Sequence, residues 1–319
     1  MREFIVDPAD AGLRLDKWLA TRTDAGSRTR AAEWLTRGKV FVNGSPVDAA
    51  SAARSVSAGL RVGVWVDRPG SSKSVDRDVQ SLRHALNIVH EDAAIVVVNK
   101  PAGLIVEPLP GRAGEEPTLL DLLRDHDRHR PRARSYVVHR IDRDTSGLVL
   151  FARTLAARNA LKKQFEKHSP ERVYLAVVEG QPSPPEGTWR DMLAWDPKFL
   201  RQRKAHGTDA RGKTAEAHYK VIEAFPTGTS LVEVSLVTGK RNQIRVQAAM
   251  RGHPLVGEKQ YRFEDRRAQE ARPHATEIGR QALHAAALGF THPATGRKVR
   301  YQSPLPEDLA QMLARFRKR

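Results

Sequence analysis

The sequence contains no cysteine among its 319 residues. This absence excludes disulfide bonds, thiolate metal sites and cysteine nucleophiles, and it suits a reducing compartment, so we expect a cytoplasmic protein. No apolar run approaches the roughly 20 residues of a transmembrane helix, and the first residues lack the apolar core of a secretory signal. Aromatic residues are only 6% of the chain, which argues against a surface that binds single strands purely by stacking.

Acidic residues are too few to balance the basic ones. The chain has 54 Lys and Arg residues but 37 Asp and Glu residues, which gives a formal net charge of +17. Such an excess favours a polyanionic partner, with nucleic acid as the first candidate and an anionic membrane as the second. A basic protein without such a partner is the third possibility. A length of 319 residues predicts about two domains.

Three segments follow one another along the chain. We expect a first domain over residues 1–66, a linker over residues 67–81 and a second domain over residues 82–319. The linker is predicted because its residues are polar and rich in glycine, serine and charge.

The first domain reads as two helices followed by a hairpin. "RLDKWLATR" and "SRTRAAEWLTRG" have helical spacing of apolar residues, and the second has Ser27 as a candidate N-cap and Gly38 just past its end. "KVFVNGSPV" predicts two short strands around Asn43-Gly44, a strong hairpin signal. Basic side chains gather on the second helix and the hairpin. As a pattern alone, they also fit an ordinary solvated face.

The order of these elements resembles the S4 RNA-binding module, over about residues 12–66. The resemblance implies that the helical face and the following turn contact structured RNA. The basic side chains would then contact phosphates, which positions RNA without reading its sequence. The residues in question are Arg28, Arg30, Arg37 and Lys39.

Strand and helix patterns alternate irregularly in the second domain. "AAIVVVNK" is a continuous apolar run and predicts a buried strand, and "SYVV", "LVLFA" and "RVYLAVVEG" predict others. "PTLLDLLRDH" and "TLAARNALKKQFEKH" have the spacing of amphipathic helices, the latter with Leu155, Leu161 and Phe165 on one face. We therefore expect an α+β fold on a mixed, mainly antiparallel sheet.

The segment "HRIDRDTSG", which begins at His139, concentrates reactive side chains between two predicted strands. Asp142 and Asp144 form a D-x-D pair, as in metal-dependent phosphatases. In those enzymes an apolar strand leads directly into the first aspartate, whereas Arg140 and a histidine intervene here. Ser146 stands where threonine or valine is expected, and arginines on both sides of Asp142 are a poor setting for a divalent cation.

Two other kinds of site find little support. Ser146 lacks the G-x-S-x-G turn of a serine hydrolase. "DHDRHR", which begins at Asp125, has metal-ligating residue types but no recognisable ligand spacing, so a polar helix end is the better interpretation. We therefore expect no metal site.

A carboxylate flanked by cations remains. Arg140 and Arg143 favour the ionised form of Asp142, which suits a nucleophile or a general base. An ion pair that only fixes the loop would use the same residues, so the segment alone leaves both interpretations open.

The same segment resembles the H-R-[hydrophobic]-D-x-x-T-S-G signature of the RluA/RluC/RluD-type pseudouridine synthases. Four other segments resemble further blocks of that family, in the family's order, so that the resemblance covers the chain after the linker. They are "VVVNKPAGLIVEP" from Val96, "RVYLAVVEG" from Arg172, "LVTGKRNQIRVQAAMRGHPLVGEKQYR" from Leu236 and "ALHAAALGFTHPATG" from Ala282.

The resemblance implies an RNA-modifying isomerase. These enzymes detach uracil from its sugar in RNA, rotate it and rejoin it through carbon, with the target uridine flipped out of the structure. All atoms come from the substrate, so no small-molecule cofactor and no metal are implied. The expected partner is structured RNA, most of all 23S (large-subunit) rRNA, and we expect a monomer with no membrane association.

The resemblance also assigns roles to residues. Asp142 matches the essential aspartate, and the match leaves open whether it attacks the sugar, attacks the base or acts as a general base. Tyr174 would stack on the flipped uracil, Arg245 would pair with Asp142 and hold it ionised, and Arg140 would occupy the space the base leaves. Residues expected to support the site are Lys100, Thr145, Gly147 and Gln243.

Some positions depart from the family pattern. Asn242 and Gln247 stand where histidines are usual, Lys240 replaces an arginine, and Glu107 replaces another histidine. We expect these departures to affect the RNA-facing surface more than the chemistry. The alternative function is a non-catalytic S4-type RNA-binding or ribosome assembly factor.

Overall fold

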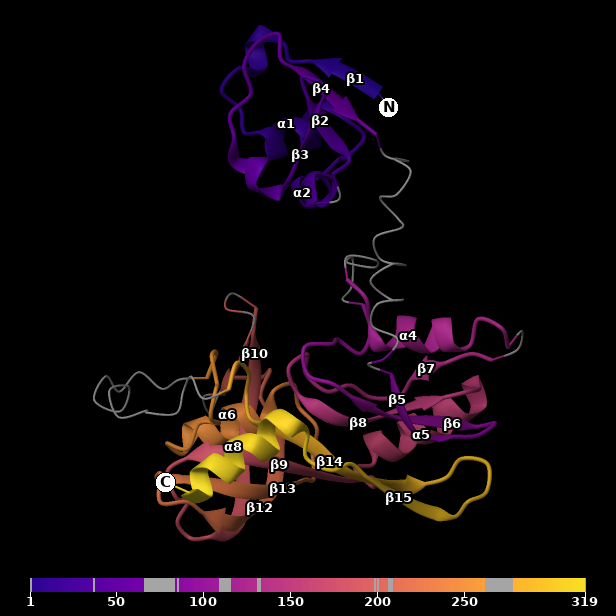
Figure 1. The fold of residues 1–319 in the computed structure, drawn as a ribbon, viewed down its shortest axis with the longest axis vertical. Helices are drawn as coiled ribbons and strands as arrows, with labels where there is room; N and C mark the ends of the chain where they lie inside the picture. Colours follow the sequence, from indigo (N-terminus) through magenta and orange to yellow (C-terminus); the bar gives the residue numbers. More distant parts are fainter. Residues whose placement is uncertain are drawn as a thin grey trace. The chain divides into compact units, whose positions relative to one another are not determined.

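The computed structural model divides the chain into two compact units, Met1–Ser81 with Leu109–Pro117, and Leu82–Pro108 with Thr118–Arg319 (Figure 1). The predicted linker, residues 67–81, and Arg37 lie outside the described residues. The described residues are 2–36, 38–65, 84, 86–108, 116–130, 133–197, 199, 201–205, 209–261 and 278–318.

The described residues of the N-terminal unit form two α-helices, two 3-10 helices and a sheet with the strand order β1-β4-β2-β3. Both predicted helices and the predicted hairpin are present; β1 and β4 were not predicted, because four-residue strands carry little periodic signal. The elements are β1 (Arg2–Ile5), η1 (Pro8–Asp10), α1 (Leu15–Arg22), α2 (Arg28–Thr36), β2 (Val40–Val42), β3 (Ser45–Val47), η2 (Ala49–Ala53) and β4 (Arg61–Val64).

Local sequence explains these elements. Ser27 Oγ accepts a hydrogen bond from the backbone N–H of Arg30 at 3.2 Å, as an N-cap does. Asn43 and Gly44 both have positive φ, 49° and 80°, as a tight hairpin turn requires. Trp18 and Trp34 are buried in one apolar core between the helices and the sheet.

The C-terminal unit is built on one large sheet with the strand order β11-β10-β12-β13-β9-β14-β8-β6-β5. Strand β14 pairs in parallel with β8, and the other described pairs are antiparallel, so the predicted mixed, mainly antiparallel sheet is confirmed. Its strands are β5 (Asn87–Glu91), β6 (Ile95–Lys100), β7 (Tyr136–Val137), β8 (Ser146–Ala152), β9 (Glu171–Glu179), β10 (Glu186–Asp196), β11 (Arg201–Lys204), β12 (Lys213–Ala224), β13 (Thr229–Leu236), β14 (Leu283–Thr291) and β15 (Lys298–Gln302).

Helices cover this sheet through separate apolar clusters. These helices are α4 (Leu119–His126), α5 (Leu155–Glu166), α6 (Gln243–Met250) and α8 (Glu307–Lys318). Ile244 and Ala248 of α6 pack against residues of β9, β10, β12 and β13, while Leu161 of α5 packs against β6 and β8. The prediction that Leu155 belongs to the buried apolar face of α5 is wrong, because this residue is 56% exposed. Among the described residues, no helix is long and apolar enough to cross a bilayer.

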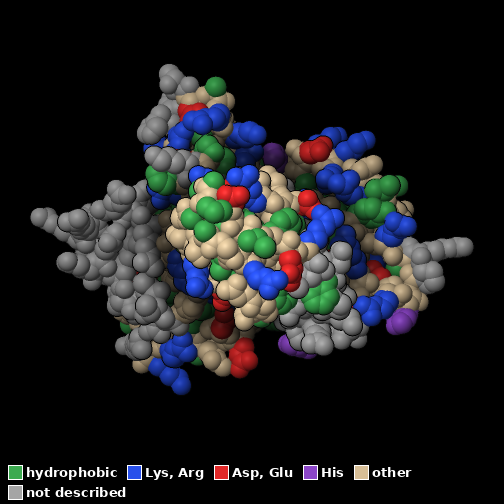
Figure 2. All heavy atoms as spheres, turned by 90° about the horizontal axis from the view of Figure 1, so that it is seen from above, with side chains coloured by type: hydrophobic (Ala, Val, Ile, Leu, Met, Phe, Trp, Pro, Cys, Tyr) green, Lys and Arg blue, Asp and Glu red, His purple; other side chains and the backbone are tan. Residues whose placement is uncertain are grey.

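Basic side chains are more common than acidic ones on the surface. Figure 2 shows a face with more Lys and Arg side chains than carboxylates, which agrees with the net charge of +17. At the end of α4, Glu91, His126 and Asp127 lie close enough together to hold a cation. Arg153 Nη2 lies 2.6 Å from Glu91 Oε1, Arg153 also pairs with Asp127, and Arg130 pairs with Glu91, so two guanidiniums balance the two carboxylates.

Candidate active site

The loop that carries Asp142 enters strand β8, at the parallel pair in the middle of the sheet. His139 anchors the start of this loop, because its Nε2 accepts a hydrogen bond from the backbone N–H of Leu150 at 3.1 Å. Its ring stacks on Phe165, with the centroids 4.8 Å apart. Burial, helped by the charge of Arg172, lowers the pKa of His139 to about 3, so the imidazole is a neutral acceptor.

Lys100 ties two loops together beneath the site. Its Nζ donates hydrogen bonds to the backbone carbonyls of Pro101, Leu104 and Arg143 at 2.8, 2.6 and 2.7 Å. The side chain is fully buried, and this burial lowers the pKa of Lys100 to about 7, although Asp144 and Asp142 oppose the shift. Through the carbonyl of Arg143, Lys100 therefore holds the loop that carries Asp142.

At Gly147 the end of the loop lies so close to strand β14 that there is no room for a side chain. Gly147 has a φ of +113°, and a Cβ at this position would lie 2.3 Å from the carbonyl oxygen of Ala285. Thr145 is buried, its backbone N–H donates to the carbonyl of Asp142 at 3.2 Å, and its hydroxyl accepts from Gln281 at 3.4 Å. These contacts fix the shape of the turn.

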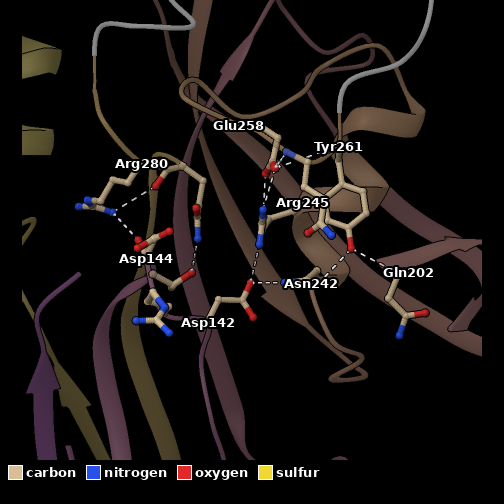
Figure 3. A network of polar contacts seen from close by, with 12 residues as sticks. Asp142, Asp144, Gln202, Asn242, Arg245, Glu258, Tyr261 and Arg280 are labelled. Carbon is tan, nitrogen blue, oxygen red and sulfur yellow. Dashed lines mark hydrogen bonds and ion pairs between the residues drawn. The ribbon is translucent and has the colours of Figure 1, made fainter. Parts of the chain in front are cut away.

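The other polar residues of the loop also have structural partners. Ser146 Oγ lies 3.0 Å from His284 Nδ1 and is buried, which removes it as a candidate nucleophile. Arg280 Nη1 donates to the backbone carbonyl of Asp144 at 3.1 Å (Figure 3).

Asp142 has two unequal oxygens. Oδ2 accepts a hydrogen bond from Asn242 Nδ2 at 2.6 Å and another from Arg245 Nη1 at 3.2 Å (Figure 3). Among the described residues, Oδ1 has no hydrogen bond, and the side chain is 26% exposed. The carboxylate is thus held by one oxygen and presents the other to solvent.

Arg245 reaches Asp142 from helix α6 and is itself fixed from the other side. Its Nε and Nη2 each lie 2.7 Å from one oxygen of Glu258, whose side chain is only 1% exposed. Burial acts to lower the pKa of Arg245, but Glu258 and then Asp142 raise it above its ordinary value. The guanidinium is permanently charged and has little rotational freedom.

Gln243 shapes the start of the same helix. Its Oε1 accepts from the Thr238 hydroxyl at 2.8 Å and from the backbone N–H of Lys240 at 2.9 Å, and its Nε2 donates to the carbonyl of Glu216 at 3.0 Å. Gln243 therefore holds the loop before α6 in place, one residue after Asn242.

The pairing of strands β9, β14 and β8 positions Tyr174 near the loop of Asp142. In β9 it lies opposite Ala285 of β14, which lies opposite Gly147 of β8, and it shares an apolar cluster with Ile141. Burial raises the pKa of Tyr174 to about 12, with a smaller contribution from Asp142. Its hydroxyl is therefore protonated at neutral pH and suits stacking or donation better than proton abstraction.

The remaining predicted residues make contacts of their own. The Arg140 side chain is 53% exposed, with Nη1 3.2 Å from Glu107 Oε1. In the N-terminal unit, Arg28 Nη2 pairs with Asp16 at 2.8 Å, and Arg30 lies over the ring of Trp34 at 5.8 Å. Lys39 lies just before β2, at the end of the turn after α2.

Two departures from the family pattern have contacts that the sequence did not predict. Asn242 contacts Asp142 directly, so it lies in the candidate site itself. Gln247 is fully buried and donates to Asp191 at 2.7 Å, so it belongs to the core. Glu258 and Tyr261 received no role at all. No local pattern in "HPLVGEKQY" distinguishes Glu258 from the other acidic residues.

Comparison with known proteins agrees with this geometry. Residues 94–250 match the RNA pseudouridylate synthase family, and residues 13–53 match the S4 domain. The uncharacterized RNA pseudouridine synthase YlyB of Bacillus subtilis is 37% identical over 96% of this chain and 94% of its own length. The chain belongs to the RNA pseudouridine synthase family. The N-terminal unit is its S4 RNA-binding domain, and the protein is an isomerase that acts on RNA.

Other members of the family extend the comparison. The ribosomal large subunit pseudouridine synthase D of Pseudomonas aeruginosa is 36% identical over 96% of this chain and 92% of its own length. The solved structure of human RNA pseudouridylate synthase domain containing 4 has a TM-score of 0.58, 21% identity, and covers 77% of this chain and 95% of its own. This likeness shows the shared fold of the catalytic domain.

Proposed function

We propose that this pseudouridine synthase modifies uridines of the 23S (large-subunit) rRNA and that Asp142 is its reactive carboxylate. Support for the target comes from the relatives named as large-subunit enzymes, at about 36% identity over nearly the whole chain. The net charge of +17 fits a large polyanionic substrate.

The asymmetry of Asp142 supports its role most directly. Arg245 and Asn242 both engage Oδ2, so the carboxylate is oriented while Oδ1 remains open to a substrate atom. In the reaction the N1–C1′ bond of uridine breaks and a C5–C1′ bond forms, with a proton leaving C5 and one ending on N1. Bonds and electrons balance within the nucleoside, so we propose that no cofactor and no metal take part.

Two further residues act around the flipped base in this proposal. Tyr174 offers a buried aromatic ring with a protonated hydroxyl beside the loop of Asp142, which suits stacking on uracil. Arg140 is exposed two residues before Asp142, where its guanidinium can enter the space vacated by the base. Lys100, Thr145, Gly147 and Gln243 maintain the frame of the site.

A basic groove beside Arg140 offers a path for the RNA backbone. It measures about 1030 Å³ and lies between α4, β7 and α5. Its two carboxylates are each paired, Glu107 with Arg140 and Asp127 with Arg153, so they do not repel a phosphate strongly. The basic residues that line the groove are Arg124, Arg134, Arg140, Arg158 and Lys162.

The S4 domain supplies further phosphate contacts in this proposal. Arg28 and Arg30 lie on α2 and Lys39 lies in the turn that follows it, while Arg37, which is outside the described residues, is proposed from the sequence alone. We propose the boundaries 1–66, 67–81 and 82–319 for the S4 domain, linker and catalytic domain. We also propose that the enzyme works as a monomer in the cytoplasm.

Substitution of Asp142 by asparagine tests the function. The change keeps the shape of the side chain but removes its charge, so we expect pseudouridine formation to be lost while RNA binding stays within about twofold. Pseudouridine mapping of total RNA, from cells with and without the protein, identifies the target. Sites confined to transfer RNA would overturn the ribosomal proposal. Full activity of Asp142→Asn would overturn the role of Asp142.

A further inference from the structure

Three consecutive hydrogen bonds connect strand β11 to Asp142. The backbone N–H of Gln202 lies 3.1 Å from the hydroxyl oxygen of Tyr261, and that oxygen lies 3.1 Å from Asn242 Oδ1. Asn242 Nδ2 then lies 2.6 Å from Asp142 Oδ2. Figure 3 shows this series of hydrogen bonds beside Arg245, whose guanidinium approaches the same carboxylate oxygen.

The first of these three hydrogen bonds determines the direction of the other two. A backbone N–H can only donate, so the Tyr261 oxygen accepts from Gln202 and its own hydrogen is directed to Asn242. The Asn242 amide must therefore present Oδ1 to Tyr261 and Nδ2 to Asp142, which fixes the orientation of the amide. All donors point toward the carboxylate, and successive bonds of this kind strengthen one another.

The surroundings hold both side chains in these roles. Tyr261 is 6% exposed and its ring lies 5.3 Å from the guanidinium of Arg245. Burial raises the pKa of Tyr261, so its hydroxyl keeps the proton that it donates. Asn242 has a left-handed backbone, with φ 53° and ψ 24°, at the start of α6, and its side chain makes no helix cap. Its side-chain amide forms hydrogen bonds with Asp142 and Tyr261 instead.

We propose that Asn242 and Tyr261 are positioning residues for the isomerisation. Together they occupy and orient Asp142 Oδ2, so that Oδ1 faces the substrate, and they tie this geometry to the hairpin of β10 and β11. The Tyr261 hydroxyl acts only through Asn242. The proposal rests on the role given above to Asp142.

Substitutions at Asn242 must allow for its left-handed backbone. Asn242→Gly tolerates this conformation and removes the donor, whereas Asn242→Asp keeps the shape and replaces the donor by a charge that repels Asp142. We expect kcat to fall roughly 10- to 100-fold for Asn242→Gly, the effect of losing a hydrogen bond to a charged group, and further for Asn242→Asp. The KM for RNA should stay within about twofold in both variants.

Tyr261→Phe removes one hydroxyl, and we expect kcat to fall by roughly 2- to 10-fold. In the Asn242→Gly background the same change should have no further effect, because Tyr261 acts through Asn242. Tyr219→Phe is the matched control, since its hydroxyl donates to the carbonyl of Pro184 at 2.9 Å in the same unit and it should keep full kcat.

The assay uses the full-length protein and total RNA from cells that lack it, so the target is present whatever its class. Wild-type kcat in Asn242→Gly, or an undiminished loss from Tyr261→Phe in that background, would overturn the proposal. Turnover by the wild type on transfer RNA alone would overturn the ribosomal target and leave this test intact. No pseudouridine from the wild type on any RNA would overturn both.

Discussion

Arg245 and Glu258 form a two-point ion pair behind the active site, with both N···O distances at 2.7 Å. The third nitrogen of the guanidinium, Nη1, faces Asp142 at 3.2 Å. One buried carboxylate thus fixes the arginine that orients the exposed one. This relationship gives Glu258 a structural role next to the candidate site, although it contacts Arg245 and not Asp142.

We expect Arg245→Met to reduce the free energy of unfolding by about 3–5 kcal/mol, because Glu258 would remain buried without the guanidinium that compensates its charge. The double variant Arg245→Met/Glu258→Leu should recover most of this loss, since it removes both charges. It should nevertheless stay inactive, because Asp142 loses its guanidinium. Urea unfolding and pseudouridine formation measure the two effects. A double variant as unstable as the single one would contradict the ion-pair argument.

Gly147→Ala should be severely destabilising, by more than about 4 kcal/mol, because its Cβ would overlap the backbone of Ala285. Gly296→Ala is the matched control. Gly296 also has a positive φ, +68°, but an added Cβ there has no neighbour within 4 Å, so only about 1–2 kcal/mol of backbone strain is expected. Equal losses in the two variants, measured by urea unfolding, would show that close approach to β14 is unimportant.

Lys100 predicts a pH dependence of stability. Burial lowers its pKa to about 7 in the folded protein, against about 10.4 in an unfolded chain. Between these values the unfolded state binds more protons, so this lysine makes the free energy of unfolding rise with pH, by up to about 1.4 kcal/mol per unit. The contribution is complete above the unfolded pKa and is lost as the pH falls through 7.

The control for this dependence is Lys100→Met, which has no titrating group. The difference in unfolding free energy between the wild type and Lys100→Met should therefore change steadily from pH 7 to pH 10. Urea unfolding at several pH values measures it. A difference that is constant over this range would show that Lys100 is an ordinary, fully charged ammonium.

Charge reversal tests the basic groove. Arg158→Glu and Lys162→Glu should each weaken RNA binding at all sequences and reduce the slope of log K against log salt by about 1. Lys220→Glu is the control, because Lys220 lies on β12 and does not line the groove. Binding titrations at several salt concentrations decide the matter. Equal effects from all three variants would indicate a general charge effect rather than a defined path.

The sequence by itself determined the features that depend on local pattern. Asn43-Gly44 specified a hairpin, and Ser27 and the apolar spacing specified a helix, because turns and caps involve residues close in the chain. The resemblance of "HRIDRDTSG" to a family signature predicted Asp142 as the candidate carboxylate, because the whole signature lies in one short loop.

Only the tertiary structure decided what surrounds that carboxylate. Asn242 lies 100 residues beyond Asp142 in the chain, and Tyr261 lies 19 beyond Asn242, so no local periodicity connects them. Glu258 reads in sequence as one acidic residue among many, and becomes a partner of Arg245 only when α6 packs on the sheet. Hydrogen bonds depend on distance and direction in space, which are set here by the packing of α6 on the sheet and not by position in the chain.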